Sequence, residues 1–257
     1  MIDSNKKLIV GNWKMNPESA REAKQIFSAI KKTGSKLRNV QTVVCPPSLY
    51  IDTLQQLVGG HRVVVGAQNM FWEEKGPFTG EISPLMLSKN NVSYVILGHS
   101  ERRALGETNE IVNKKVKAVF KHNITPILCV GETVRDENSL YLNFVKEELK
   151  ESLAGIPKSA IKKVVIAYEP IWAIGKDATR GANPEESLEM ILFIKKTLSD
   201  LYGASAIEGM MMLYGGSVSP ANAKMFLREG GVDGLLVGRA SLDGKTFSDI
   251  LNGANEL

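Results

Sequence analysis

The chain has 257 residues, of which 43% are hydrophobic and 23% are charged, and its formal net charge is +4. This length and apolar content are sufficient to bury the core of one full domain. The positive charges form no basic run, so neither nucleic-acid binding nor membrane binding is expected. The two cysteines, Cys45 and Cys129, are too few for a disulfide framework and have no zinc-ligand spacing.

No targeting or membrane segment is predicted. The first ten residues contain only a short apolar stretch, which is unlike a secretion signal. No apolar run approaches the length that a transmembrane helix needs. A cytoplasmic location is therefore expected, and Cys129 is expected to be a small buried hydrophobe inside its apolar segment.

Eight short apolar segments, typical of buried strands, recur along the chain. They begin at Leu8, Thr42, Val63, Tyr94, Pro126, Val164, Met210 and Gly234. Segments with helical periodicity, such as 18–32 and 109–122, lie between them. This alternation predicts parallel βα units, and eight units in about 250 residues match a (β/α)8 barrel. No linker or break in composition divides the chain, so residues 1–257 are expected to form a single domain.

An open, doubly wound sheet is the competing architecture. Such a sheet usually carries a glycine-rich dinucleotide turn after its first strand, where this chain has Gly-Asn-Trp-Lys. Neither GxGxxG nor GxxxxGK[ST] occurs in the sequence. The barrel is therefore the better prediction.

Four predicted helix starts share one pattern, in which a capping residue precedes a proline. They are Asn16–Pro17, Ser83–Pro84, Asn183–Pro184 and Ser219–Pro220. The cap side chain accepts a free backbone N–H, and proline fits the first helical position because its missing N–H is not needed there.

In a (β/α)8 barrel the residues just beyond the C-terminal ends of the strands form the active face. Polar or small residues follow six of the predicted strands at this point. They are Asn12 and Lys14, Gln68 and Asn69, His99 to Arg102, Glu169, Tyr214 to Ser217, and Gly238. These residues are the candidates for a functional site.

Glu169 is the candidate base. It follows the apolar run 164–167 and precedes Pro170, which keeps it extended at the tip of the strand. The next residues, 170–175, are apolar and include Trp172, an unusual composition for an exposed loop. One interpretation is a lid that excludes water from a reacting carboxylate. The alternative is a strand-end glutamate in a salt bridge, with the loop packed on a neighbour.

His99 opens a short helical segment, HSERR. A helix N-terminus disfavours an imidazolium, so His99 is expected to be neutral and able to donate a hydrogen bond at pH 7. The alternative is a core histidine that is satisfied by the backbone. The other two histidines, His61 before a strand and His122 at a helix end, are expected to be structural.

Gly215, Gly216 and Ser217 precede a capped helix and can offer backbone N–H groups to a phosphate-type anion. A simple turn would use the same residues, but barrels often bind phosphate after strands seven and eight. Lys14, beside Asn12, is either a surface cation or a second positive group at the same mouth. No metal-ligand cluster or cofactor turn is present in the sequence, so proton transfer next to a carbonyl, with neither metal nor cofactor, is the expected chemistry.

Six segments of the sequence carry a family resemblance. They are GNWKMN (11–16), WEEKGPFTGEIS (72–83), GHSERR (98–103), CVGE (129–132), AYEPIWAIG (167–175) and YGGSV (214–218). Together they closely resemble the triosephosphate isomerase family, in the family's order and from Leu8 to about Asp243. The resemblance implies a cofactor-free enzyme that interconverts dihydroxyacetone phosphate and glyceraldehyde 3-phosphate.

The resemblance also implies a role for each matching residue. Glu169 corresponds to the base, and His99 to the group that polarises the carbonyl. Lys14 and Asn12 correspond to residues that hold the substrate and balance its developing charge. Supporting positions are Ser100, Glu101, Tyr214, Gly215, Gly216 and Glu132, the last as the partner of Trp172. The N–H groups of Gly175, Ser217 and Gly238 correspond to the phosphate grip, which Arg239 adjoins. The family is homodimeric, and the loop 68–81 resembles its interface loop, with Thr79 reaching the neighbouring active site.

Three departures from the family pattern occur. Lys176 and Asp177 replace the usual residues of the lid, where Lys176 is expected to offset the charge of Asp177. Arg239 replaces a glycine, and the segment after Glu132 is unusual. Two alternatives therefore stay open, an isomerase of another ketose phosphate, such as a tetrulose phosphate, and a silent sugar-phosphate sensor. The intact set of Lys14, His99 and Glu169 argues against silence.

Overall fold

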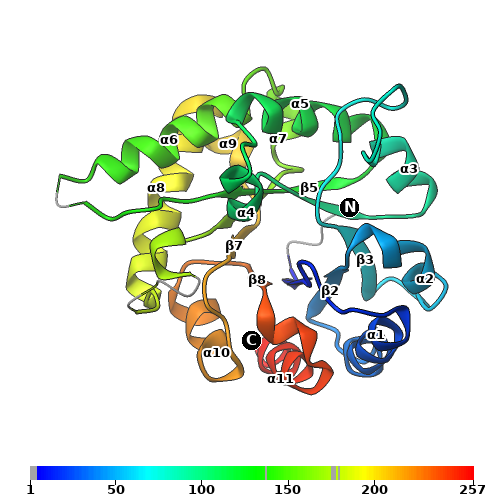
Figure 1. Ribbon diagram of the computed structural model, residues 1–257. Coiled ribbons are helices and arrows are strands. Elements are labelled where there is room, and N and C mark those ends of the chain that lie inside the picture. The colour runs from blue at the N-terminus through cyan, green and yellow to red at the C-terminus, as the bar shows by residue number, and fades with distance from the viewer. Residues whose placement is uncertain (1–4, 137, 175–177, 179) are drawn as a thin grey trace.

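The computed structural model describes residues 5–136, 138–174, 178 and 180–257. Its eight parallel strands pair in sequence order and close into a barrel, which a ring of helices surrounds (Figure 1). The strands are β1 (Lys7–Asn12), β2 (Val40–Cys45), β3 (Val63–Ala67), β4 (Tyr94–Leu97), β5 (Thr125–Val130), β6 (Val165–Tyr168), β7 (Met212–Tyr214) and β8 (Gly234–Val237). The predicted (β/α)8 fold is confirmed.

The helices surround the barrel, and all but the last lie between two strands in the chain. They are α1 (Ala20–Gly34), α2 (Ile51–Gln55), α3 (Pro84–Lys89), α4 (Ser100–Ala104), α5 (Asn109–Val119), α6 (Leu140–Ser152), α7 (Lys158–Ile161), α8 (Pro184–Tyr202), α9 (Ala204–Ile207), α10 (Pro220–Glu229) and α11 (Gly244–Asn255). Short 3-10 turns are η1 (Ser48–Tyr50), η2 (Phe120–His122), η3 (Ile171–Ala173) and η4 (Arg239–Leu242). Within the described ranges, no helix is long and apolar enough to cross a membrane.

The strands are apolar along their whole length because both of their faces are buried. In β1, Leu8 and Val10 belong to a cluster built from strand residues that fills the barrel, and Ile9 belongs to the larger cluster between strands and helices. The barrel closes where Leu8 lies beside Gly234 of β8. Two-sided burial explains the nearly continuous apolar runs in the sequence.

Three of the four predicted helix starts are confirmed, and the fourth is wrong. Ser83, Asn183 and Ser219 are the N-cap residues of α3, α8 and α10, and each precedes a proline. Asn16 does not cap a helix, because α1 begins at Ala20 and Ser19 accepts the N–H of Glu22 instead. The Asn16 amide donates to the carbonyl of Trp13, and the Asn16–Pro17 peptide bond is cis.

Candidate active site

Glu169 and His99 form a buried pair at the C-terminal end of the barrel. The N–H of Glu169 donates to the carbonyl of Val130, so Glu169 continues the line of β6 as its sequence position predicted. His99 Nε2 lies 2.9 Å from Glu169 Oε1, and the N–H of Ser100 donates to Glu169 Oε2 at 2.9 Å. The ends of β4 and β6 thus place an imidazole and a carboxylate in direct contact.

The hydrogen bonds of His99 indicate its tautomer. His99 is the N-cap of α4, and its Nδ1 accepts the backbone N–H of Glu101 at 3.2 Å. Because Nδ1 acts as an acceptor, the proton of the neutral ring resides on Nε2, which faces Glu169. His99 therefore presents a hydrogen-bond donor to the mouth of the barrel.

Burial and mutual contact set the pKa values of this pair. Burial raises the pKa of Glu169, but His99, the N–H of Ser100 and Lys14 lower it more, so the net shift is downward. Burial lowers the pKa of His99, and the carboxylate of Glu169 more than reverses this effect. The helix N-terminus was expected to disfavour the charged form of His99, but the adjacent carboxylate raises the pKa of the ring instead. Glu169 is ionised at neutral pH, as a general base must be.

Lys14 reaches the same mouth from the loop after β1. Its φ angle of 54° lies in the left-handed region, which residues other than glycine rarely adopt. Asn12 Oδ1 accepts the N–H of Lys14 at 3.1 Å, and Gln68 Nε2 donates to the carbonyl of Lys14 at 2.8 Å. Lys14 Nζ lies 2.6 Å from Glu101 Oε1. The ends of β1 and β3 therefore hold the lysine in an uncommon conformation. The sequence position of Gln68 indicated a residue at the mouth of the barrel but did not indicate that it supports Lys14.

Glycines at the strand ends allow close packing around Glu169. A Cβ atom on Gly215 would lie 3.0 Å from Glu169 Cγ, and one on Gly131 would lie only 1.8 Å from the Glu169 carbonyl oxygen. A Cβ atom on Gly216 would lie 2.2 Å from the hydroxyl of Tyr214. Larger residues at these positions would therefore displace the strand ends that carry the pair.

Trp172 and Glu132 are in contact, as the resemblance implied. Trp172 Nε1 donates to Glu132 Oε1 at 2.7 Å, and the hydroxyl of Tyr168 donates to the same oxygen at 2.8 Å. Two guanidinium groups also lie over the indole. The distance from Cζ to the ring centroid is 5.5 Å for Arg135 and 4.7 Å for Arg180. Neither arginine was expected at this position from the sequence. The only available signal was the unusual segment after Glu132, which contains Arg135.

The expected phosphate end lies beside Lys14. A Cβ atom on Gly238, just after β8, would lie 3.5 Å from Lys14 Cε. Ser217 and Arg239 are exposed, and Asn222 Nδ2 holds the carbonyl of Ser217 at 2.9 Å. The other expected residues at this end, Gly175, Lys176 and Asp177, lie outside the described residues.

Most of the remaining candidates lie away from this centre, but Cys129 lies beside Glu169. Thr79 is exposed in the loop between β3 and α3. His61 precedes β3 at the opposite end of the barrel, and His122 lies in η2, 3.1 Å from Glu74. Cys45 and Cys129 are free and buried. In the part of the chain that the structure describes, no group of three His, Cys, Asp or Glu residues could hold a metal ion.

The fold and the site together define a class, the (β/α)8-barrel proteins with a buried carboxylate and a hydrogen-bond donor at the C-terminal mouth. A sequence model of one family, triosephosphate isomerase, matches residues 7–254. The chain therefore belongs to the triosephosphate isomerase family.

Curated relatives agree with this assignment. The triosephosphate isomerase of Clostridium tetani is 46% identical over 249 residues, which cover 96% of each chain. That of Clostridium novyi is 44% identical and covers 96% of this chain and 98% of its own. That of Caldanaerobacter subterraneus subsp. tengcongensis is 43% identical and covers 95% and 98%.

The chain is accordingly an isomerase that interconverts triose phosphates. Neither the family match nor the relatives support the two alternatives, an isomerase of a four-carbon ketose phosphate and a silent sensor.

Proposed function

We propose that the chain interconverts dihydroxyacetone phosphate and glyceraldehyde 3-phosphate with Glu169 as the base. The 2.9 Å contact between Glu169 and His99 carries the proposal, because it places an ionised carboxylate beside a hydrogen-bond donor. The carboxylate removes a proton from the carbon next to the carbonyl, which gives an enediolate. The hydroxyl proton then moves to the former carbonyl oxygen, with His99 as the proposed carrier, and the carboxylate returns a proton to the adjacent carbon. No electron leaves the substrate in either step, so the reaction as proposed uses no cofactor.

His99 is proposed to stabilise the oxygen on which negative charge develops. In the structure its Nε2 proton is shared with Glu169 Oε1. The substrate oxygen would take over this hydrogen bond and release the carboxylate for proton transfer. The N–H of Glu101 keeps Nδ1 occupied, so the ring holds its orientation during the exchange. A preorganised donor of this kind acts mainly on the transition state.

Lys14 and Asn12 are proposed to bind the substrate, and Ser100 and Glu101 to support the pair. The N–H of Ser100 already holds Glu169, and Glu101 contacts both Lys14 and His99. The phosphate is proposed to lie near the start of α10, where a helix N-terminus favours an anion. Its ligands there would be the N–H groups of Gly175, Ser217 and Gly238, with Arg239 close by.

A deuterium-exchange experiment tests the role of Glu169. With dihydroxyacetone phosphate in D2O, the wild type should introduce solvent deuterium at the carbon that exchanges its proton. Glu169→Gln keeps the shape but cannot accept the proton, so exchange and isomerisation should both fall by roughly 10²–10⁴-fold. Glu208→Gln, at an exposed position, is the matched control and should behave as the wild type. A Glu169→Gln enzyme that retains most of its activity would contradict the proposal.

A homodimer is part of the same proposal. Five large apolar side chains are exposed on or next to the loops that follow β1 to β4, an unusual concentration for a monomer surface. They are Met15, Leu49, Phe78, Met86 and Leu105, of which Met15 is 95% exposed. A second copy of the chain that covers this sector would bury them, and Thr79 would then reach the partner's active site.

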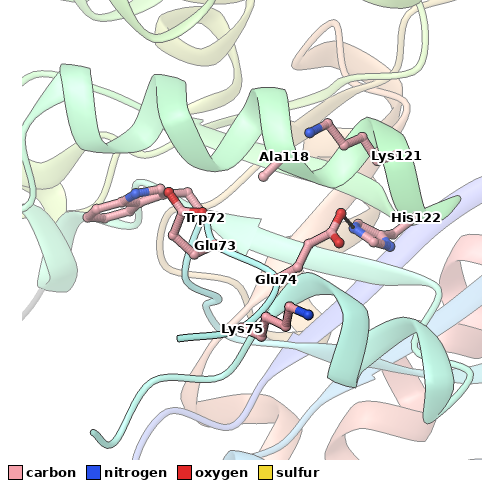
Figure 2. Close-up of a pocket in the computed structure, with 7 residues that line it drawn as sticks. All are labelled: Trp72, Glu73, Glu74, Lys75, Ala118, Lys121 and His122. Carbon is pink, nitrogen blue, oxygen red and sulfur yellow. Dashed lines mark hydrogen bonds and ion pairs between the residues drawn. The ribbon is translucent and has the colours of Figure 1, made fainter. Parts of the chain in front are cut away.

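The loop 68–81, which is proposed to enter the partner subunit, is held by aromatic contacts within the loop. The rings of Phe71 and Trp72 stack at 3.9 Å, and Phe78 lies 4.6 Å from Phe71. Glu74, on this loop, lies 3.1 Å from His122 beside a pocket of about 370 Å³. Figure 2 shows the side chains of Glu74 and His122 pointing toward each other. A preformed loop costs less entropy when it docks, which favours association.

A cytoplasmic location is proposed as well, and the free, buried cysteines are compatible with a reducing compartment.

A further inference from the structure

We infer that Glu148 is a positioning residue that braces both proposed catalytic groups at once. The inference rests on the roles proposed above for Glu169 and His99. Glu148 lies on α6, with only 2% of its surface exposed. Its two carboxylate oxygens have different partners, the N–H of Gly131 and the guanidinium of Arg103. The first connection, or arm, runs from Glu148 through Gly131 to the backbone of Glu169. The second arm runs through Arg103 to Gly98, the residue before His99.

The first arm runs through the end of β5. The N–H of Gly131 donates to Glu148 Oε2 at 2.8 Å. Gly131 packs directly against the backbone of Glu169, since a Cβ atom there would lie 1.8 Å from the Glu169 carbonyl oxygen. The N–H of Glu169 also bonds to Val130, the residue before Gly131. A displacement of Gly131 would therefore move the backbone that carries the base.

The second arm runs through Arg103 to the end of β4. Arg103 Nε lies 3.3 Å from Glu148 Oε1 and donates to the carbonyl of Gly98 at 2.7 Å. Arg103 Nη2 donates to the carbonyl of Cys129 at 3.3 Å. Gly98 precedes His99 and has a φ angle of 66°, so the guanidinium fixes the peptide that orients the imidazole. The same arginine ties this turn to β5.

The burial of Glu148 argues for a positional role. An apolar residue would fill the same place without the desolvation cost of a carboxylate. It would, however, leave the buried N–H of Gly131 and the guanidinium of Arg103 without this acceptor. The charged groups that face Glu148 are Arg103, Glu132 and Glu169, and only Arg103 attracts it. The carboxylate is thus held in place by the two contacts that reach the catalytic strands.

Substitutions on α6 test this inference. Glu148→Leu cuts both arms, and we expect kcat to fall about tenfold while KM stays within twofold, because small misplacements act on the transition state. Glu148→Gln keeps one acceptor oxygen and should recover part of the loss. Glu147→Gln, exposed on the same helix and paired with Lys150, is the control and should match the wild type. The ¹⁵N resonances of His99 should shift in Glu148→Leu, and those of His61 should not.

The outcomes separate this inference from a purely structural role and from the proposed function. A folded Glu148→Leu enzyme with kcat within twofold of the wild type and unshifted His99 resonances overturns the inference. If that variant does not fold, Arg103→Lys provides the test. A lysine lacks the planar fork with which Arg103 contacts Gly98, Cys129 and Glu148 together, so kcat should fall about tenfold. A kcat within twofold of the wild type overturns the inference. An active Glu169→Gln enzyme contradicts the proposed function whatever the Glu148 variants show.

Discussion

The proposed base is fully buried and yet ionised, and individual hydrogen bonds explain why. An isolated carboxylate at this depth would take up a proton, because burial disfavours the charged form. Glu169 instead accepts from His99 Nε2 and from the N–H of Ser100, and these contacts lower its pKa. The same contacts hold the carboxylate in one orientation at the mouth of the barrel. A ligand that accepts the hydrogen bond of His99 in place of Glu169 would therefore raise the pKa of Glu169 at the moment when a base is needed.

His99→Ala should lower kcat by about 100-fold and change KM by less than about threefold. The reason is that a donor aimed at developing charge acts on the transition state more than on the bound substrate. His61→Ala, exposed at the far end of the barrel, is the control and should leave both constants unchanged. Steady-state kinetics in both directions measures the effect. An unchanged kcat with a higher KM would assign His99 to binding alone.

Single residues also show how far the sequence predicts the site. The strand count placed Asn12, Lys14, His99 and Glu169 at one end of a barrel, and the structure brings them together there. It did not reveal that Glu169 and His99 are direct partners, because contacts between side chains depend on rotamers and on the strand register. Gln68, Arg103 and Glu148 were missed as supports, since a polar residue in a helix or loop carries no sequence signal for the groups that it contacts.

At the scale of elements, local patterns predicted type more reliably than boundaries. All eight predicted strands are present, but β7 begins at Met212 rather than Met210. The N–H of Met210 bonds to Ile207 in the preceding turn, so the apolar run extends beyond the strand itself. The prediction that Asn16 caps a helix was wrong because the local pattern did not identify where α1 begins. Ser19 offers an equally good cap three residues later, and propensity alone does not choose between them.

The helix α6 carries a pH-dependent contribution to stability. Burial raises the pKa of Glu148 to about 7, while contacts with Arg103 and Gly131 lower it. The folded state therefore holds this proton more tightly than the unfolded chain. The stabilisation is present below the unfolded pKa of about 4.5 and is lost as pH rises through about 7.

Between pH 5 and pH 8 the free energy of unfolding should fall by about 2 kcal/mol more in the wild type than in Glu148→Gln. Urea unfolding at fixed protein concentration measures this difference, and contributions from other titrating groups cancel in the comparison. Glu147→Gln should follow the wild type, because Glu147 is exposed. Equal pH dependence in Glu148→Gln and the wild type would show that Glu148 does not titrate as stated.

At the scale of the whole molecule, the site is assembled from segments that are distant in sequence. Asn12 and Lys14 come from the first strand and its loop, and Gly238 follows the last strand. The closed barrel makes these ends neighbours, because β1 pairs with β8. Five exposed apolar side chains lie around the first four strands, among them Met15 and Leu105, and this sector is the one proposed for association.

Thr79→Arg should weaken the proposed homodimer and lower activity. The substitution places a large cation at the point where the loop would enter the partner, and burying it unpaired is costly. Light scattering and activity measured over a dilution series report both effects. Ser28→Arg, exposed on α1, adds the same charge elsewhere and should change neither. A wild type that is monomeric by light scattering would overturn the proposed dimer.

The pairing of β1 with β8 has a consequence for synthesis. Gly234 is synthesised long after Leu8, although the two residues are neighbours in the barrel. Until β8 emerges, the nascent sheet has two free edges, and such edges can pair with other chains. A chain truncated before Gly234 would keep both edges open permanently. Chaperones should therefore engage the unfinished chain far more strongly than the released one, because closure of the barrel removes every edge in a single final step.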